Sequence, residues 1–197
     1  MILTVASYKG GVTKTTVAIH LAAYLQTKGP TLLLDGDPTR NALEWSEAGE
    51  GLPFMVAPVS FAAKLVPKYE HVVIDTGQRL VGKDFREAVD ACDMLIIPTP
   101  PSSMDARALV QTIQALREMG SDKYRVLLSR VPPSPERDAF ALRLLLEEQG
   151  VPVFNTEIPR LKAFERAARD GQIVHDVADR SASRAWEAFT SLGKEIA

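Results

Sequence analysis

The fold is decided by the stretch Lys9-Gly10-Gly11-Val12-Thr13-Lys14-Thr15-Thr16, which comes shortly after an apolar run at residues 2–6. An apolar strand, a glycine-rich turn, a Lys-Thr pair and then a helical pattern form the layout of a phosphate-binding loop. Adjacent glycines let backbone N–H groups surround phosphate oxygens without Cβ clashes. The helix that begins near Thr15 adds unpaired N–H groups and the positive end of its dipole. The stretch therefore predicts a nucleoside triphosphate site, with Lys14 at the β- and γ-phosphates and the Thr15 hydroxyl as a Mg²⁺ ligand.

Length and composition favour one cytoplasmic domain. The chain has 197 residues, about the size of a single domain, so we expect residues 1–197 to form one unit. Its net charge of −2 gives no general attraction to nucleic acid. The single cysteine, Cys92, cannot form an internal disulfide, which fits a reducing compartment. No run approaches the ~18 apolar residues of a membrane span, so we expect no membrane insertion.

Short β-rich runs alternate with helical stretches along the chain. We expect strands at residues 2–6, 31–34, 54–57, 71–74, 94–98, 125–128 and 152–154. We expect helices at residues 15–27, 41–47, 61–66, 83–91, 103–119, 135–149, 161–169 and 181–196. The strands are near-continuous apolar runs, which is typical of a parallel sheet covered on both faces. The sequence therefore predicts an α/β fold: a doubly wound, mostly parallel sheet flanked by helices, as in P-loop NTPases.

Carboxylates follow two of the expected strands. Asp35 and Asp37 come at the end of the second strand, and Asp75 ends the fourth. The carboxyl ends of strands in an open α/β sheet face the ligand crevice. Asp35 and Asp37 are therefore candidates to serve Mg²⁺ and an attacking water, although Asp-Gly is also a good turn pair by itself. Asp75 is expected to accept a hydrogen bond from a metal-bound water or from Thr15.

The pattern Lys-Gly-Gly-x-x-Lys-Thr-Thr resembles the deviant Walker A motif of the ParA/MinD superfamily. Residues 32–38, Leu-Leu-Leu-Asp-Gly-Asp-Pro, are similar to the second ParA signature, and residues 72–75 resemble a Walker B strand. The chain departs from the family pattern at Thr13, which is usually glycine, and at Ser129, where the family often has the asparagine that reads adenine. The resemblance is greatest to small ParA-type partition ATPases and implies hydrolysis of ATP with Mg²⁺ by one P-loop ATPase domain.

The resemblance also implies roles for individual residues. Lys9 is expected to reach across a face-to-face dimer to the partner's phosphates, as an arginine finger does. Asp37 is expected to orient the hydrolytic water, so the catalytic set is Lys9, Lys14 and Asp37. The expected metal site consists of Thr15, Asp35 and Asp75. The residues expected to contact the nucleotide are Gly10, Gly11, Val12, Thr13, Lys14, Thr15, Thr16, Asp35 and Pro159, the last because an Ile-Pro-Arg segment borders the adenine pocket in the family.

Family members of this size form ATP-dependent homodimers that bind DNA without sequence specificity. A ParB-like or other adaptor stimulates their slow hydrolysis, so the expected role is partition of plasmids or chromosomes and the expected location is the nucleoid. Lys162, Arg166 and Arg169 have the spacing of one helix face, and Arg184 follows nearby. These residues are the candidate DNA contacts, because a basic stripe doubled by dimerisation holds phosphates with salt-dependent affinity. An ordinary solvated helix face is the competing interpretation.

Other functions within the superfamily remain open at this point. A relative that positions another cargo on the nucleoid, such as carboxysomes, has the same motifs. A membrane-surface switch like MinD ends in a basic amphipathic helix, whereas residues 186–197 contain one Lys and two Glu, so attraction to anionic lipid is weak and we expect no membrane partner. An iron–sulfur relative needs two cysteines per subunit for a Cys₄ cluster shared by a dimer, and this chain has one.

Overall fold

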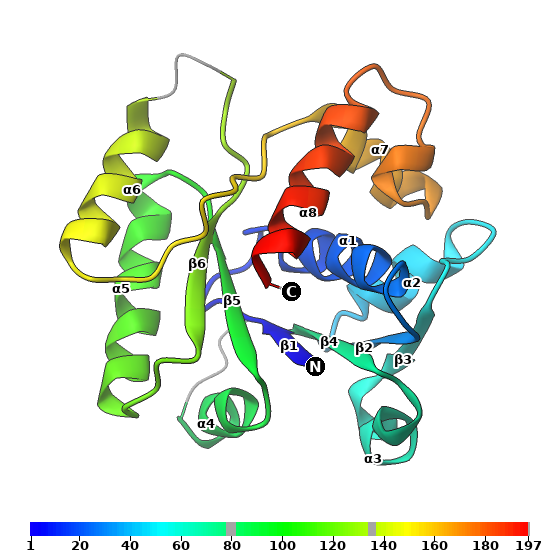
Figure 1. Cartoon of the computed structure of the whole chain (residues 1–197), viewed down its shortest axis with the longest axis horizontal. Helices are drawn as coiled ribbons and strands as arrows, with labels where there is room; N and C mark the ends of the chain where they lie inside the picture. Colours follow the sequence, from blue (N-terminus) through cyan, green and yellow to red (C-terminus); the bar gives the residue numbers. More distant parts are fainter. Residues whose placement is uncertain (78–81, 134–136, 197) are drawn as a thin grey trace.

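A six-stranded parallel sheet forms the centre of the fold, in the order β3-β2-β4-β1-β5-β6 (Figure 1). The computed structural model describes residues 1–77, 82–133 and 137–196. The strands are β1 (Ile2–Val5), β2 (Thr31–Gly36), β3 (Met55–Pro58), β4 (His71–Thr76), β5 (Met94–Thr99) and β6 (Tyr124–Leu128). Because β1 lies between β4 and β5, the chain winds away from it in both directions, and ligands of such sheets bind at that switch point. The predicted α/β class is confirmed.

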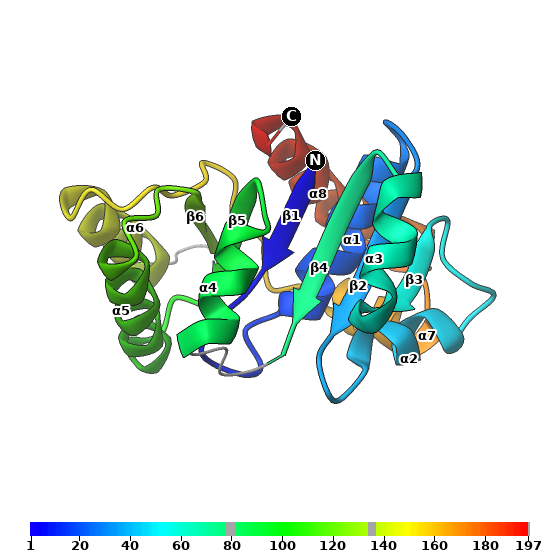
Figure 2. The ribbon, with the colours of Figure 1, turned by 90° about the horizontal axis from the view of Figure 1, so that it is seen from below.

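Helices cover both faces of the sheet (Figures 1 and 2). One face carries α1, α2, α7 and α8, and the other carries α3, α4, α5 and α6. Their bounds are α1 (Lys14–Gln26), α2 (Asn41–Glu47), α3 (Ala62–Leu65), α4 (Gly82–Asp90), α5 (Ser103–Glu118), α6 (Arg137–Glu148), α7 (Lys162–Asp170) and α8 (Ala182–Ile196). Single 3₁₀ turns occur at Val59–Phe61, Val66–Lys68 and Val174–Asp176.

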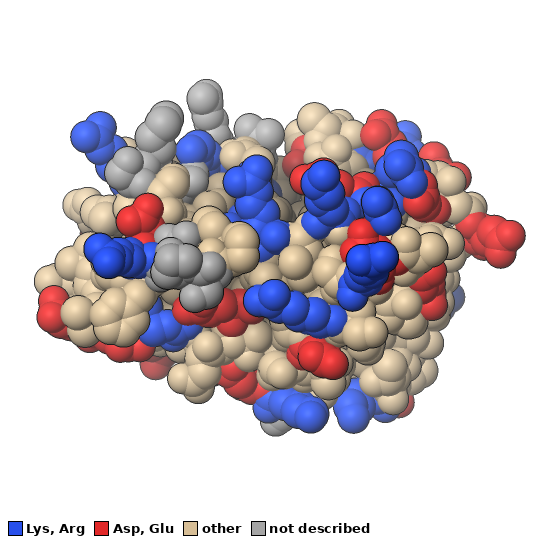
Figure 3. Space-filling model, turned by 90° about the horizontal axis from the view of Figure 1, so that it is seen from above, with Lys and Arg blue, Asp and Glu red and all other residues tan. Residues whose placement is uncertain are grey.

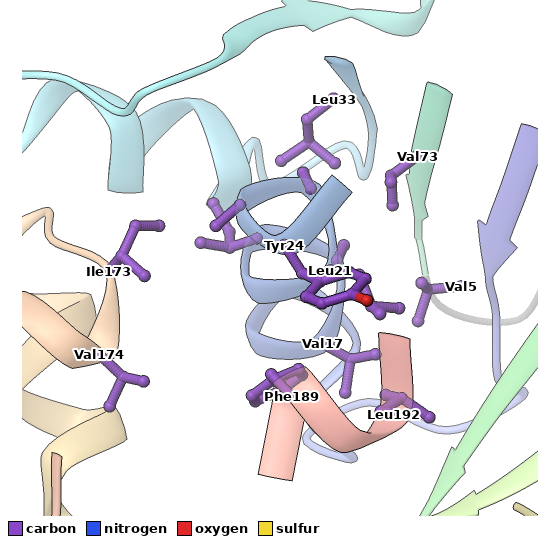
Figure 4. Close-up of a cluster of buried hydrophobic side chains, with 14 of the residues drawn as sticks. Val5, Val17, Leu21, Tyr24, Leu33, Val73, Ile173, Val174, Phe189 and Leu192 are labelled. Carbon is purple, nitrogen blue, oxygen red and sulfur yellow. The ribbon is translucent and has the colours of Figure 1, made fainter. Parts of the chain in front are cut away.

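The helix that follows the phosphate-binding loop, α1, is largely buried in the core. Helix α1 is apolar around most of its surface, as expected of a helix covered on all sides. Side chains from the sheet pack against one side of α1, and Phe189 and Leu192 of α8 pack against another side (Figure 4). A Cβ added at Gly193 would lie 2.2 Å from the Tyr24 ring, so glycine allows this close contact between α8 and α1. The loop is therefore anchored to a rigid helix.

Successive side chains of each strand pack on opposite faces of the sheet, which explains why the strands are continuous apolar runs in the sequence. In β5, Ile96 belongs to the cluster under α1, whereas Leu95 and Ile97 pack with α4 and α5 on the opposite face. In β6, Leu127 and its neighbour Val126 divide in the same way. Both faces are buried, so both sets of alternate positions are apolar.

Three expected elements differ in the structure. The expected strand at 152–154 is a single bridge between Val126 and Val153, because only two backbone bonds, Val126 N–H to Pro152 O and Phe154 N–H to Val126 O, join it to β6. The expected helix at 61–66 is a short α3 between two 3₁₀ turns, the second of which contains Pro67. The expected helix at 135–149 is observed as the shorter α6 (Arg137–Glu148), and residues 135 and 136 of that prediction lie outside the described part.

Candidate nucleotide-binding site

The glycine-rich loop joins the end of β1 to the start of α1 and turns sharply there. Gly11 and Thr13 both have φ of +75°. Thr13 stands immediately before α1 in the left-handed conformation, at a place where a β-branched residue is strained by about 1–2 kcal/mol relative to glycine. Its hydroxyl donates to the carbonyl of Val12. The loop thus lies where the sequence predicted it. Thr13 adopts there the left-handed backbone conformation that glycine would adopt without strain.

Lys14 lies at the start of α1 and is buried. Its Nζ donates to the carbonyl oxygen of Lys9 at 3.2 Å, which folds the loop back over the ammonium group. Burial lowers the pKa of Lys14, and the nearby carboxylates of Asp75 and Asp37 oppose that shift. Lys9 itself is half-buried and its N–H donates to Ser7 Oγ at 3.3 Å. Its role across a dimer stays a prediction.

Thr15 and Asp75 meet at the base of the loop. The Thr15 hydroxyl donates to Asp75 Oδ2 at 2.7 Å, which joins the first turn of α1 to the end of β4. Asp75 is fully buried, and its Oδ1 has no hydrogen-bond partner among the described residues. Burial raises the pKa of Asp75 to about 7. A buried carboxylate oxygen without a partner, beside a hydroxyl and a phosphate-binding loop, fits a small divalent cation with oxygen ligands.

The two aspartates at the end of β2, Asp35 within the strand and Asp37 directly after it, have different surroundings. Asp35 accepts main-chain hydrogen bonds on both oxygens, from the N–H of Asp37 at 2.9 Å and of Leu43 at 3.0 Å, and so fixes the turn that leads into α2. Asp37 Oδ1 accepts bonds from the N–H and the hydroxyl of Thr39, at 2.8 and 2.6 Å. Both aspartates are buried at the same edge of the sheet as Asp75. The metal role of Asp35 stays a prediction, and the structure adds a turn-forming role to it.

A cavity of about 300 Å³ opens beside the first turn of α1. Its wall is mostly apolar, with charged groups at Arg130, Arg160 and Glu165. Pro159 lines it, so the structure brings this expected contact next to Thr13 and Thr16 of the loop. The remaining lining residues are Val17, Ile158, Leu161, Phe164 and Ala168. An apolar cavity adjoining a phosphate-binding loop is suited to a nucleobase.

The residues after β6 contact the loop, and one of them was missed by sequence reasoning. Ser129 stands where the family often has an adenine-reading asparagine, and its hydroxyl donates to Val12 O at 3.3 Å. Arg130, at φ +51°, donates from Nη1 to Gly11 O at 3.2 Å and lines the cavity. Arg130 could have been found from its position directly after an apolar strand, because parallel strands present their ligand-binding residues at that edge of the sheet.

The predicted basic stripe lies on the solvent side of α7. Lys162, Arg166 and Arg169 are exposed, opposite buried alanines of the same helix. Arg166 pairs with Asp179 at 2.9 Å, and Arg169 pairs with its neighbour Asp170 at 2.6 Å. Arg184 is exposed in the first turns of α8. Figure 3 shows basic side chains gathered on this side of the molecule with acidic ones among them, so much of the positive charge is locally compensated.

The described part of the chain contains neither a ready-made cluster of metal-binding side chains nor a membrane-spanning helix. No group of three or more His, Cys, Asp or Glu side chains in residues 1–77, 82–133 and 137–196 is arranged to hold a metal ion. Within the same ranges, no helix has the length and apolar character needed to cross a membrane. A cation bound at Thr15 and Asp75 would take the rest of its oxygen ligands from phosphate and water.

Comparison with known proteins agrees with this geometry. Residues 3–174 match the family described as the CobQ/CobB/MinD/ParA nucleotide binding domain. The chain is 34% identical over 201 residues to Maintenance of carboxysome distribution protein A of Gloeobacter kilaueensis, covering 99% of this chain and 93% of that protein. It is 28% identical over 207 residues to the protein of the same name from Halothiobacillus neapolitanus, covering 98% and 95%. The fold also matches a solved Cyanothece McdA variant in complex with ATP, with a TM-score of 0.76 at 18% identity over 98% and 96% of the two chains. The resemblance to the ParA/MinD superfamily is confirmed, and the chain belongs to the CobQ/CobB/MinD/ParA family of P-loop nucleotide-binding domains.

Proposed function

We propose that this chain is a Mg²⁺-dependent ATPase that dimerises with ATP, binds DNA without sequence specificity and positions a cargo on the nucleoid in the cytoplasm. One observation carries the proposal. The Thr15 hydroxyl and the buried Asp75 carboxylate are 2.7 Å apart at the base of a glycine-rich loop, and Asp75 Oδ1 has no partner among the described residues. This pair supports a bound cation at the place where a triphosphate meets the N-terminus of α1.

In the proposed hydrolysis, one set of residues binds the phosphates and Mg²⁺, and another residue orients the attacking water. The loop N–H groups and the Lys14 ammonium bind the phosphates, and Thr15 with Asp75 holds Mg²⁺. The ion, when bound, supplies positive charge to the phosphate oxygens during transfer. Asp37 orients the attacking water, because its carboxylate is fixed by Thr39 within the electrostatic range of Lys14. Catalysis of this kind depends on positioning and charge neutralisation rather than on a covalent intermediate.

Dimerisation would make binding to DNA depend on the bound nucleotide. In the proposed dimer, Lys9 of one subunit meets the phosphates bound by the other, so that ATP becomes part of the interface and hydrolysis dissolves it. The basic residues of α7 and α8 are then present twice on one assembly, which favours retention on DNA through phosphate contacts. An adaptor protein carried by the cargo stimulates hydrolysis and releases the dimer.

The cargo that we propose is a carboxysome. This choice is supported by the names of the relatives, which are maintenance of carboxysome distribution proteins and match nearly the whole chain. Partition of a plasmid or chromosome is the second candidate, because the matching family also includes ParA proteins. The adaptor distinguishes the two: a carboxysome-associated protein from a neighbouring gene should stimulate the ATPase in the first case, and a ParB-like DNA-binding protein in the second.

The central test compares the parental chain with Asp37→Ala. The parental chain should hydrolyse ATP only when Mg²⁺ is present and should double its mass with ATP, but not with ADP, in size-exclusion chromatography with light scattering. Asp37→Ala should still bind ATP and dimerise but lose turnover, whereas Asp122→Ala, at the opposite edge of the sheet, should behave as the parent. Turnover at the parental rate in Asp37→Ala would remove the water-orienting role, and a mass indifferent to nucleotide would refute the dimer switch.

A further inference from the structure

Consecutive residues after β6 hold consecutive carbonyl groups of the phosphate-binding loop. Ser129 Oγ donates to Val12 O at 3.3 Å, and Arg130 Nη1 donates to Gly11 O at 3.2 Å. These contacts join parts of the chain separated by 117 and 119 positions. The loop is therefore held from one side by the strand that lies two places from β1 in the sheet.

Holding a carbonyl also orients the amide next to it. A trans peptide unit is planar, and its C=O and N–H groups point in opposite directions. With the Gly11 carbonyl turned towards Arg130, the N–H of Val12 is directed to the other side of the loop. The Ser129 contact does the same for the N–H of Thr13. Successive N–H groups turned to one side make a concave anion site whose donors are already oriented.

The backbone of Arg130 is itself unusual. Its φ of +51° is a left-handed conformation that costs free energy for a residue with a Cβ. Neighbouring bonds enforce it, since Ser129 N–H donates to Thr99 O and Val131 N–H donates to Ile158 O, both at 3.0 Å. The described non-glycine residues with positive φ are Thr13, Arg40 and Arg130, and all follow strands at the ligand edge of the sheet. The strain is therefore concentrated around the site.

We propose that Arg130 is a positioning residue of the nucleotide site. Its guanidinium holds the Gly11 carbonyl so that the loop presents N–H groups to phosphate, and the same side chain forms a wall of the adjoining cavity. Arg130 thus links the phosphate end of the site to the cavity that contains Pro159. This inference rests on the proposed binding of a nucleoside triphosphate.

The test measures binding by calorimetry with two probes, Mg·ADP and Mg·tripolyphosphate, the second of which has no base. Arg130→Gln should weaken both by roughly tenfold, because a charge-assisted bond that orients the donors is lost. Arg86→Gln is the matched control: it removes the same charge from an exposed position on α4, on the opposite face of the sheet from the cavity. It should change the dissociation constants by less than about twofold, within the small effect expected of an exposed charge. Arg130→Lys should recover part of the loss.

A glycine variant separates positioning from a structural role. Arg130→Gly relieves the positive φ but removes the guanidinium, so thermal stability without ligand should be unchanged or higher while both probes bind as weakly as to Arg130→Gln. Equal losses in Arg130→Gln and Arg86→Gln would overturn the proposal in favour of general charge attraction. A loss confined to Mg·ADP would overturn it in favour of a base contact, and unchanged binding in Arg130→Gln would also refute it. If the parental protein binds neither probe, the proposed function itself fails, and this inference with it.

Discussion

Asp75→Asn should stabilise the protein without ligand while it weakens the binding of Mg²⁺-nucleotide. The carboxyl group is fully buried, and its pKa is raised from 3.8 to about 7 because burial penalises the charged form. A difference of about three pKa units corresponds to about 4 kcal/mol between the protonation states, at about 1.36 kcal/mol per unit. Asparagine has nearly the same shape, stays neutral and can still accept the Thr15 hydrogen bond.

The pH dependence follows from the sign of that shift. Between pH 3.8 and about 7, the folded state keeps a proton that the unfolded chain has released, so the parental stability falls as pH rises through this window. Above about pH 7 the charge is present in both states and the full cost applies. Asp75→Asn should therefore gain up to about 4 kcal/mol over the parent at pH 8 and show almost no difference at pH 4.

Urea unfolding of both proteins across pH 4 to 8 measures this difference directly, with Asp122→Asn as the surface control that should show none. Addition of Mg·ADP should reverse the order at pH 8, because ligand stabilises only the protein that binds it. An Asp75→Asn protein that unfolds at the same urea concentration as the parent at pH 8, or at a lower one, would refute the claim that burial makes the charged Asp75 carboxylate costly to the folded protein.

Other predictions concern the loop, the core and the basic stripe. Thr13→Gly should raise the free energy of unfolding by about 1 kcal/mol in urea titration, since glycine adopts the φ of +75° without strain; a loss of stability would contradict this. His20 is fully buried and its pKa is lowered to about 4, so the native state should lose stability as pH falls from 6.5 through 4; NMR titration of its imidazole near pH 6.5 would argue against that burial. Lys162→Ala should lower the magnitude of the slope of log DNA affinity against log salt concentration by about 0.9. Arg169→Ala should change this slope less, because Asp170 already pairs with the Arg169 side chain. Equal slopes for the parent and Lys162→Ala would show that Lys162 is not part of the DNA surface.

The parts of the fold that the sequence predicted well are those with a local physical cause. The glycine pair and the Lys-Thr pair mark the loop, and an apolar run that ends in Asp75 marks a strand end at the ligand edge. Parallel strands covered on both faces need apolar residues at every position. Their continuous apolar runs could therefore be recognised between the helical stretches. The Thr15–Asp75 bond was anticipated for the same reason, because both residues end or begin elements that must meet at one edge.

Long-range geometry explains what sequence reasoning missed. Arg130 and Gly11 are far apart along the chain, and no local pattern says which strand lies close enough to bring them together. Residues 152–154 have the composition of a strand, but their pairing with β6 is limited to one bridge at Val153, and residue types do not show how far such pairing extends. The engagement of both Asp35 oxygens by backbone N–H groups likewise depends on how the turn after β2 closes, which residue types alone do not determine.

The covering of α1 by α8 has a consequence for how the chain folds as it is synthesised. Helix α1 leaves the ribosome before α8, yet residues 182–196 of α8 complete its enclosure. Until they emerge, the apolar surface of α1 around Tyr24 has no cover, and the contact with Gly193 cannot form. Native packing around the loop is therefore completed late in synthesis. A nascent chain halted before residue 182 exposes the apolar surface of α1, which chaperones bind, and lacks a natively packed nucleotide site.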